Sequence, residues 1–203
     1  MKRAFILAAV IQVAAWAAQA AYVLSDNLGQ PIAGATVVGQ GQVTYEDAQT
    51  FMAVSAGTLG SITILGDNSD GANAVMELYQ ITSLSPFTFV PVGPLTPPSS
   101  WPAGPSLITW GGNNLALDAG SMYAAGLFVN GPGWTAWAYE PGSTGSGPGF
   151  LPYWAELDWS GYLNIGNTEP FLMQVEVPEP ATWLAGVGAG LVALGTLGRR
   201  ARK

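Results

Sequence analysis

The sequence has no cysteine and no histidine, and no lysine or arginine lies between Arg3 and Arg199. Without cysteine the chain can form no disulfide, thiolate metal site or cysteine nucleophile. Without histidine it has no serine–histidine pair, and its interior has no lysine for a Schiff base. An active site made of carboxylates alone passes this filter, but no motif indicates one. We therefore expect no catalytic residue, no metal site and no cofactor, and we expect that the protein is not an enzyme.

The charges that are present are separated along the chain. The basic residues all lie near its two ends: Lys2, Arg3, Arg199, Arg200, Arg202 and Lys203. The thirteen acids lie between them, so residues 21–198 carry about −13 at neutral pH. An anionic body repels a phosphate backbone, which argues against nucleic acid as a partner. Each basic cluster adjoins an apolar run, and this pattern keeps a chain end on the cytoplasmic side of a membrane.

The first twenty residues have the pattern of a secretory signal peptide. After the basic start, residues 4–16 are almost entirely apolar, and Ala18 and Ala20 put small side chains at the two positions that signal peptidase reads. The spacing predicts export through the Sec translocon and cleavage after Ala20. A buried amphipathic helix is the alternative, but the run shows no polar face.

The end of the chain has three parts. Val177-Pro178-Glu179-Pro180 come first, residues 181–198 are uncharged and mostly apolar, and the basic tail of residues 199–203 follows. A helix over residues 181–198 would be about 27 Å long at ~1.5 Å per residue, close to the hydrocarbon thickness of a bilayer. The terminal cations would stay in the cytoplasm, so residues 21–176 would lie outside.

This combination of a Pro-Glu-Pro tripeptide, an apolar span and an arginine-rich tail resembles the PEP-CTERM sorting signal. The resemblance covers residues 177–203, and a matching signal peptide stands at the other end of the chain. In that family an exosortase, a membrane protease or transpeptidase, recognises the tail and removes it near the motif. The resemblance implies that Val177, Pro178, Glu179 and Pro180 are read by that enzyme. An ordinary single-pass anchor, retained in the mature protein, is the alternative.

Residues 21–176 read as one β-rich domain, because short alternating runs are bounded by glycine, proline, asparagine or aspartate. About ten strands at this spacing predict a single β-sandwich or jelly-roll-like domain. Residues 86–105, with seven prolines, are expected to form an extended surface loop. The predicted strands are 35–38, 42–45, 51–55, 61–65, 74–80, 107–110, 122–129, 134–139, 153–159 and 171–177.

Aromatic residues are frequent from residue 101 to residue 162, and exposed rings can stack on sugars. The candidate glycan contacts are Trp134, Trp137, Tyr139 and Trp154, although most rings of such a domain belong to its core. Glu156 and Asp158 share one face of a predicted strand, where carboxylates for solubility are the simpler interpretation. Asp67 and Asp70 lack the spacing of a calcium loop and read as part of a turn.

These observations predict an exported bacterial protein that is inserted in the membrane through its C-terminal helix before processing. It would then be delivered to the cell surface or the extracellular matrix. The expected role is structural or adhesive, in or near exopolysaccharide. A carbohydrate-binding module and a permanently anchored surface protein are the alternatives.

Overall fold

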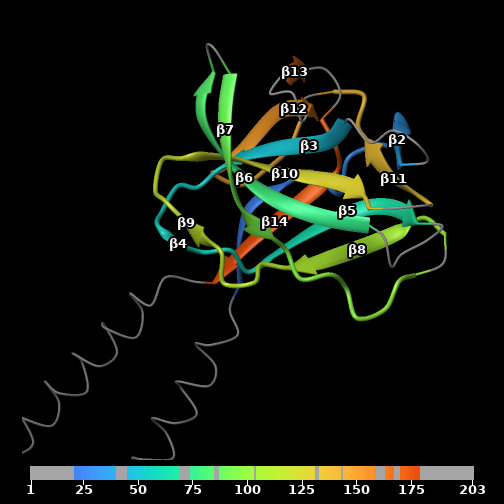
Figure 1. The fold of residues 1–203 in the computed structure, drawn as a ribbon, viewed down its shortest axis with the longest axis horizontal. Coiled ribbons are helices and arrows are strands. Elements are labelled where there is room, and N and C mark those ends of the chain that lie inside the picture. The colour runs from blue at the N-terminus through green and yellow to red at the C-terminus, as the bar shows by residue number, and fades with distance from the viewer. Residues whose placement is uncertain are drawn as a thin grey trace, which may run out of the picture. The chain divides into compact units, whose positions relative to one another are not determined.

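The computed structural model describes residues 21–39, 45–68, 74–84, 87–102, 104–130, 133–142, 144–158, 163–166 and 170–178. Residues Val23–Val177 form one compact unit. Within the described residues the chain forms strands β1 to β14 and no helix. The predicted all-β class is therefore confirmed (Figure 1).

Sheet A has six strands, in the order β1-β14-β5-β11-β2 with β8 paired to β5. The central strand β5 pairs with β8 over Ser61–Gly66, with β14 over Ser61–Ile64 and with β11 over Gly66–Asn68. The strands of sheet A are β1 (Ala21–Asp26), β2 (Gly34–Gly39), β5 (Ser61–Asn68), β8 (Ser106–Gly111), β11 (Trp134–Tyr139) and β14 (Met173–Pro178).

Sheet B also has six strands, in the order β13-β12-β3-β10-β6-β7. Figure 1 shows the β6–β7 hairpin projecting from the rest of this sheet. A third, two-stranded sheet pairs β4 with β9. The bounds are β3 (Tyr45–Met52), β4 (Gly57–Thr58), β6 (Ala74–Leu84), β7 (Phe87–Pro94), β9 (Ala116–Leu117), β10 (Met122–Val129), β12 (Phe150–Asp158) and β13 (Leu163–Gly166).

Alternation of apolar and polar residues explains how these strands face the core. In β5, Ile62 and Ile64 are fully buried, whereas Ser61 and Thr63 on the opposite face are partly exposed. Such a period of two is what a strand with one buried face requires. The strands β10 and β11 have the predicted bounds, because their apolar runs end at glycine- and proline-containing turns.

The structure differs from the prediction in several places, and strands β1, β4, β9 and β13 were not predicted. Only the first two residues of the expected strand 51–55 lie in a strand: β3 begins at Tyr45, continues through residues 46–50, which are polar except for Ala48, and ends at Met52. Residues 42–44 of the expected strand 42–45 lie outside the described residues. Within the expected proline-rich loop, residues 87–94 form β7, paired to β6 at the edge of sheet B. An edge strand tolerates proline because one side of its backbone needs no partner. The register also shifts twice along the β6–β7 pair.

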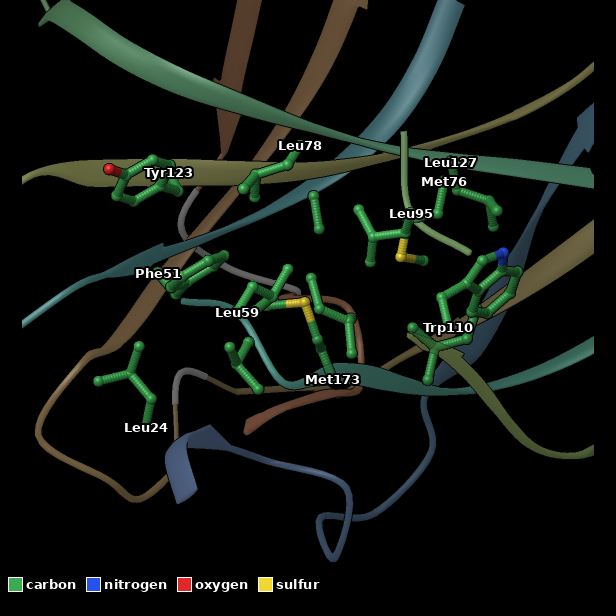
Figure 2. Packing of buried hydrophobic residues seen from close by; sticks show 14 of the residues in the cluster. Leu24, Phe51, Leu59, Met76, Leu78, Leu95, Trp110, Tyr123, Leu127 and Met173 are labelled. Carbon is green, nitrogen blue, oxygen red and sulfur yellow. The ribbon is translucent and has the colours of Figure 1, made fainter. Parts of the chain in front are cut away.

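Sheets A and B share one hydrophobic core. Figure 2 shows its side chains pointing toward one another between the two sets of strands. Sheet A contributes Ile62, Trp110 and Trp137, for example, and sheet B contributes Phe51 and Leu127, all without exposed surface. Fully burying a side chain of this size is worth about 1.5–3 kcal/mol, so this shared core is what holds the two sheets together.

Candidate sorting site

The strand β14 leads directly into the predicted sorting motif. Its residues alternate between the core and the surface: Met173, Val175 and Val177 are buried, while Gln174 and Glu176 are partly exposed. Val177 is 9% exposed and belongs to the core cluster, and Pro178, the last residue of the strand, is exposed. The first residue of the motif is therefore part of the folded domain.

Neighbours on both sides hold β14 in sheet A. On one side it pairs antiparallel with β5, from Met173 opposite Ile64 to Glu176 opposite Ser61. On the other side lies β1, and the backbone N–H of Asn27, the residue after β1, donates to the carbonyl oxygen of Met173 at 3.1 Å. Because the end of β1 lies beside the start of β14, these two strands also run in opposite directions. The start of β1 and the end of β14 therefore lie side by side.

A buried polar network fixes the segment that enters β14. The side-chain oxygen of Gln49 accepts from the N–H of Phe171 at 2.9 Å, and that of Asn27 accepts from the N–H of Met173 at 2.7 Å. The side-chain amide of Asn27 donates to the carbonyl of Phe171 and to Glu140 Oε1, both at 3.0 Å. Buried polar groups are stable in a core when they are bonded in this way.

This network could not be read from the sequence. Asn27, Gln49 and Glu140 are at most 3% exposed and come from three distant parts of the chain. Thr144 Oγ1 donates to the second oxygen of Glu140 at 2.9 Å, so both carboxylate oxygens have a donor. No pattern in the local sequence links these residues, because only the pairing of the sheets brings them together.

The rest of the predicted sorting signal lies outside the described residues. This applies to Glu179, Pro180, the predicted span over residues 181–198 and the basic residues Arg199, Arg200, Arg202 and Lys203. The predicted signal peptide, with Ala18 and Ala20, lies outside as well, and β1 begins at Ala21. Among the residues that the structure describes, none forms a helix of the length and apolar character needed to cross a bilayer.

The structure separates the residues proposed to contact a glycan. Trp137 is fully buried, its ring stacks on Phe171 at a centroid distance of 4.8 Å, and its indole N–H donates to the carbonyl of Leu172 at 3.0 Å. The prediction is wrong for Trp137, because a ring without exposed surface cannot stack on a sugar. The ring was assigned to a surface because alternation along β11 does not reveal that both faces of this strand are covered.

The other three candidates form no common platform. Trp134 and Tyr139 are half-buried and five residues apart in β11, which puts them on opposite faces of the sheet. Tyr139 packs against the core and lies over Gly34. A Cβ added to Gly34 would lie 2.5 Å from the hydroxyl oxygen of Tyr139. The backbone of Trp154 lies in β12, opposite Gln49, but its side chain is outside the described part of the chain.

The acidic residues singled out in the sequence are distributed over different elements. Asp67 lies near the end of β5 and Asp70 lies outside the described residues. Glu156 and Asp158 lie in β12, where Glu156 is opposite Asp47 of β3 in the register, and their own side chains are not described. Among the side chains that the structure does describe, no three acids gather in a way that could hold a metal ion.

Comparison with protein families identifies the C-terminal segment. Residues 176–203 match the PEP-CTERM protein-sorting motif. The resemblance predicted for residues 177–203 is thus confirmed, and the match begins one residue earlier, inside β14. The motif indicates a protein that is exported, passes through the membrane and is sorted by an exosortase. No curated protein matches the chain.

Proposed function

We propose that this chain is a non-enzymatic surface or matrix protein. An exosortase-like enzyme processes its tail and so delivers the two-sheet body to its destination. The observation that carries the proposal is the sorting-motif match over residues 176–203, which starts inside β14, the last strand of the body. The predicted signal peptide supplies entry to the Sec translocon, and the predicted span over residues 181–198 holds the precursor in the membrane. The jelly-roll-like arrangement of the body stays a prediction.

A structural role for the body is supported by how its buried polar side chains are used. Gln49 and Asn27 bond to the main chain around β14, and Glu140 accepts from Asn27 and Thr144. These groups stabilise the fold, and the body has no histidine, cysteine, lysine or arginine to add to them. The adhesive role stays a prediction: sheet A exposes single apolar side chains, among them Val37 and Leu107 at 54% and 59% exposure.

The processing step replaces a membrane tether with a free or newly attached chain end. The bond that breaks is a peptide bond near the motif. Its acyl carbon passes to water or to the amine of an acceptor, and its nitrogen leaves with the apolar segment. A permanently anchored protein would keep this bond, so the two outcomes differ in covalent mass.

The intact mass of the mature protein tests the proposal. We expect the N-terminus at Ala21 and the loss of residues 183–203, because the signal peptide and the tail are both removed. A mature protein that retains Trp183 through Lys203 would show a permanent anchor and contradict processing. Glycan arrays on the same material test the alternative of a carbohydrate-binding module, and binding to a defined glycan would favour that alternative over a purely structural role.

A further inference from the structure

The sorting-motif match and strand β14 overlap by three residues. The family match begins at Glu176, while β14 continues to Pro178. Glu176 and Val177 are therefore both matched residues and members of sheet A. Pro178, the last residue of the strand, is exposed at the end of the sheet.

Glu176 is held in the sheet by its backbone and by its side chain. Its carbonyl oxygen accepts from the N–H of Gly60 at 2.9 Å, and it lies opposite Ser61 in the register with β5. Its carboxylate oxygen Oε2 accepts from Ser61 Oγ at 3.1 Å. An enzyme that bound Glu176 in an extended active-site cleft would have to replace both hydrogen bonds and the pairing with β5.

Drawing β14 out of the sheet would also remove part of the core. Met173, Val175 and Val177 point inward from this strand, and all three belong to the shared core cluster. The strand lies between β1 and β5, so its removal leaves both neighbours without a partner on that side. Exposing the strand to a protease therefore amounts to unfolding the domain rather than opening a local flap.

We propose that the exosortase reads this chain from Pro178 onward and cuts C-terminal to Val177, because the fold withholds Glu176 and Val177. In this chain the first two residues of the family match serve the sheet and the core. The mature protein keeps β14 complete, and the enzyme approaches a domain that is already folded. This inference rests on the proposed exosortase processing and specifies which residues the enzyme contacts.

Glu176 and Glu179 lie on either side of the proposed boundary between Val177 and Pro178, so their variants form a matched pair. The test uses the full-length chain in cells that contain the exosortase, and it measures conversion of precursor to mature protein by pulse-chase and the mature C-terminus by intact mass. For E179A we expect conversion to slow by at least about tenfold, because an enzyme that binds a polar group rejects a substrate lacking it. For E176A we expect the wild-type C-terminus and a rate within about twofold, as for a surface substitution away from a binding site.

The variant E176Q separates recognition from stability, because its amide oxygen can still accept from Ser61 Oγ. It should be processed like the wild type. The inference is overturned if both E176A and E176Q slow conversion about tenfold or more, or if any mature chain ends at or before Glu176. Wild-type processing of E179A would instead contradict recognition of the sorting motif itself. Failure of the proposed function and failure of this inference are therefore distinguished by different variants.

Discussion

Among the described residues, Trp110 and Trp137 are fully buried, and their indole nitrogens differ in the groups that they reach. Trp137 donates to the carbonyl of Leu172 at 3.0 Å, on the segment that enters β14. Trp110 packs edge-on against Trp101 at 5.6 Å, and its N–H has no hydrogen-bond partner among the described residues. An intramolecular hydrogen bond contributes about 0.5–1.5 kcal/mol, whereas a buried donor without a partner is a cost.

This difference predicts unequal effects of the same substitution. W137F and W110F remove similar volumes from the core, but W137F also removes a hydrogen bond. We expect W137F to lower the free energy of unfolding by about 1 kcal/mol more than W110F does. Urea denaturation followed by circular dichroism measures both values. Equal losses, or a larger loss in W110F, would show that the bond to Leu172 is not what distinguishes the two sites.

At the scale of elements, Gly66 allows β5 to pair with two strands along one edge. It is buried at the position where the partner of β5 changes from β14 to β11. A Cβ on Gly66 would lie 2.5 Å from the carbonyl oxygen of Ala136, which is backbone and cannot turn aside. The absence of a side chain at this position therefore lets β11 approach.

We expect G66A to destabilise the domain by about 1–3 kcal/mol, because the methyl group forces β11 away from β5. The control is G57A in β4, where a Cβ meets nothing within 4 Å and the residue is exposed. That change should stay within about 0.5 kcal/mol of the wild type. Guanidinium denaturation of both variants compares them, and a stable G66A protein would argue against close contact between β5 and β11.

The local sequence predicted strands whose ends are marked by turn-forming residues. Strands β10 and β11 were found at their observed bounds because apolar runs end at glycine and proline. The polar run in β3 was missed because Gln49 and Thr50 are buried by bonds to Leu151 and Tyr153, about a hundred residues away. β7 was missed because Pro91 and Pro94 exclude a central strand, and local sequence does not say which strand is at an edge.

The sorting motif could be predicted because an enzyme reads it as a linear sequence. Its residues need no partner from the fold to be recognisable, and the match confirms them. The burial of Val177 and of Trp137 could not be predicted, because each depends on which strands pack over it. The same reason accounts for the network of Asn27, Gln49 and Glu140, which only the assembled sheets create.

For the whole molecule, charge of one sign is the dominant electrostatic feature. Removing Glu179 from the thirteen acids leaves twelve carboxylates in residues 21–178, and this segment has no lysine, arginine or histidine. Repulsion among them favours the expanded, unfolded chain, and salt weakens it by shortening the screening length to about 8 Å at physiological ionic strength.

We expect the melting temperature of the mature protein at pH 7 to rise by about 2–8 °C between low salt and 0.5 M NaCl, roughly 1 kcal/mol of stability. Scanning calorimetry measures the shift. The same series at a lower pH serves as a control, since acidification reduces the net negative charge and the effect of salt should shrink. A melting temperature that falls with salt at pH 7 would contradict net repulsion in the folded state.

The antiparallel neighbours β1 and β14 also determine how the domain responds to mechanical load. Their outer ends, at Ala21 and Pro178, lie side by side. Tension between the two chain ends would pull these strands apart as a zipper opens, breaking one hydrogen bond after another instead of shearing several at once. Under tension between its ends the domain would therefore yield at a lower force than if β1 and β14 had to slide past each other along their full length.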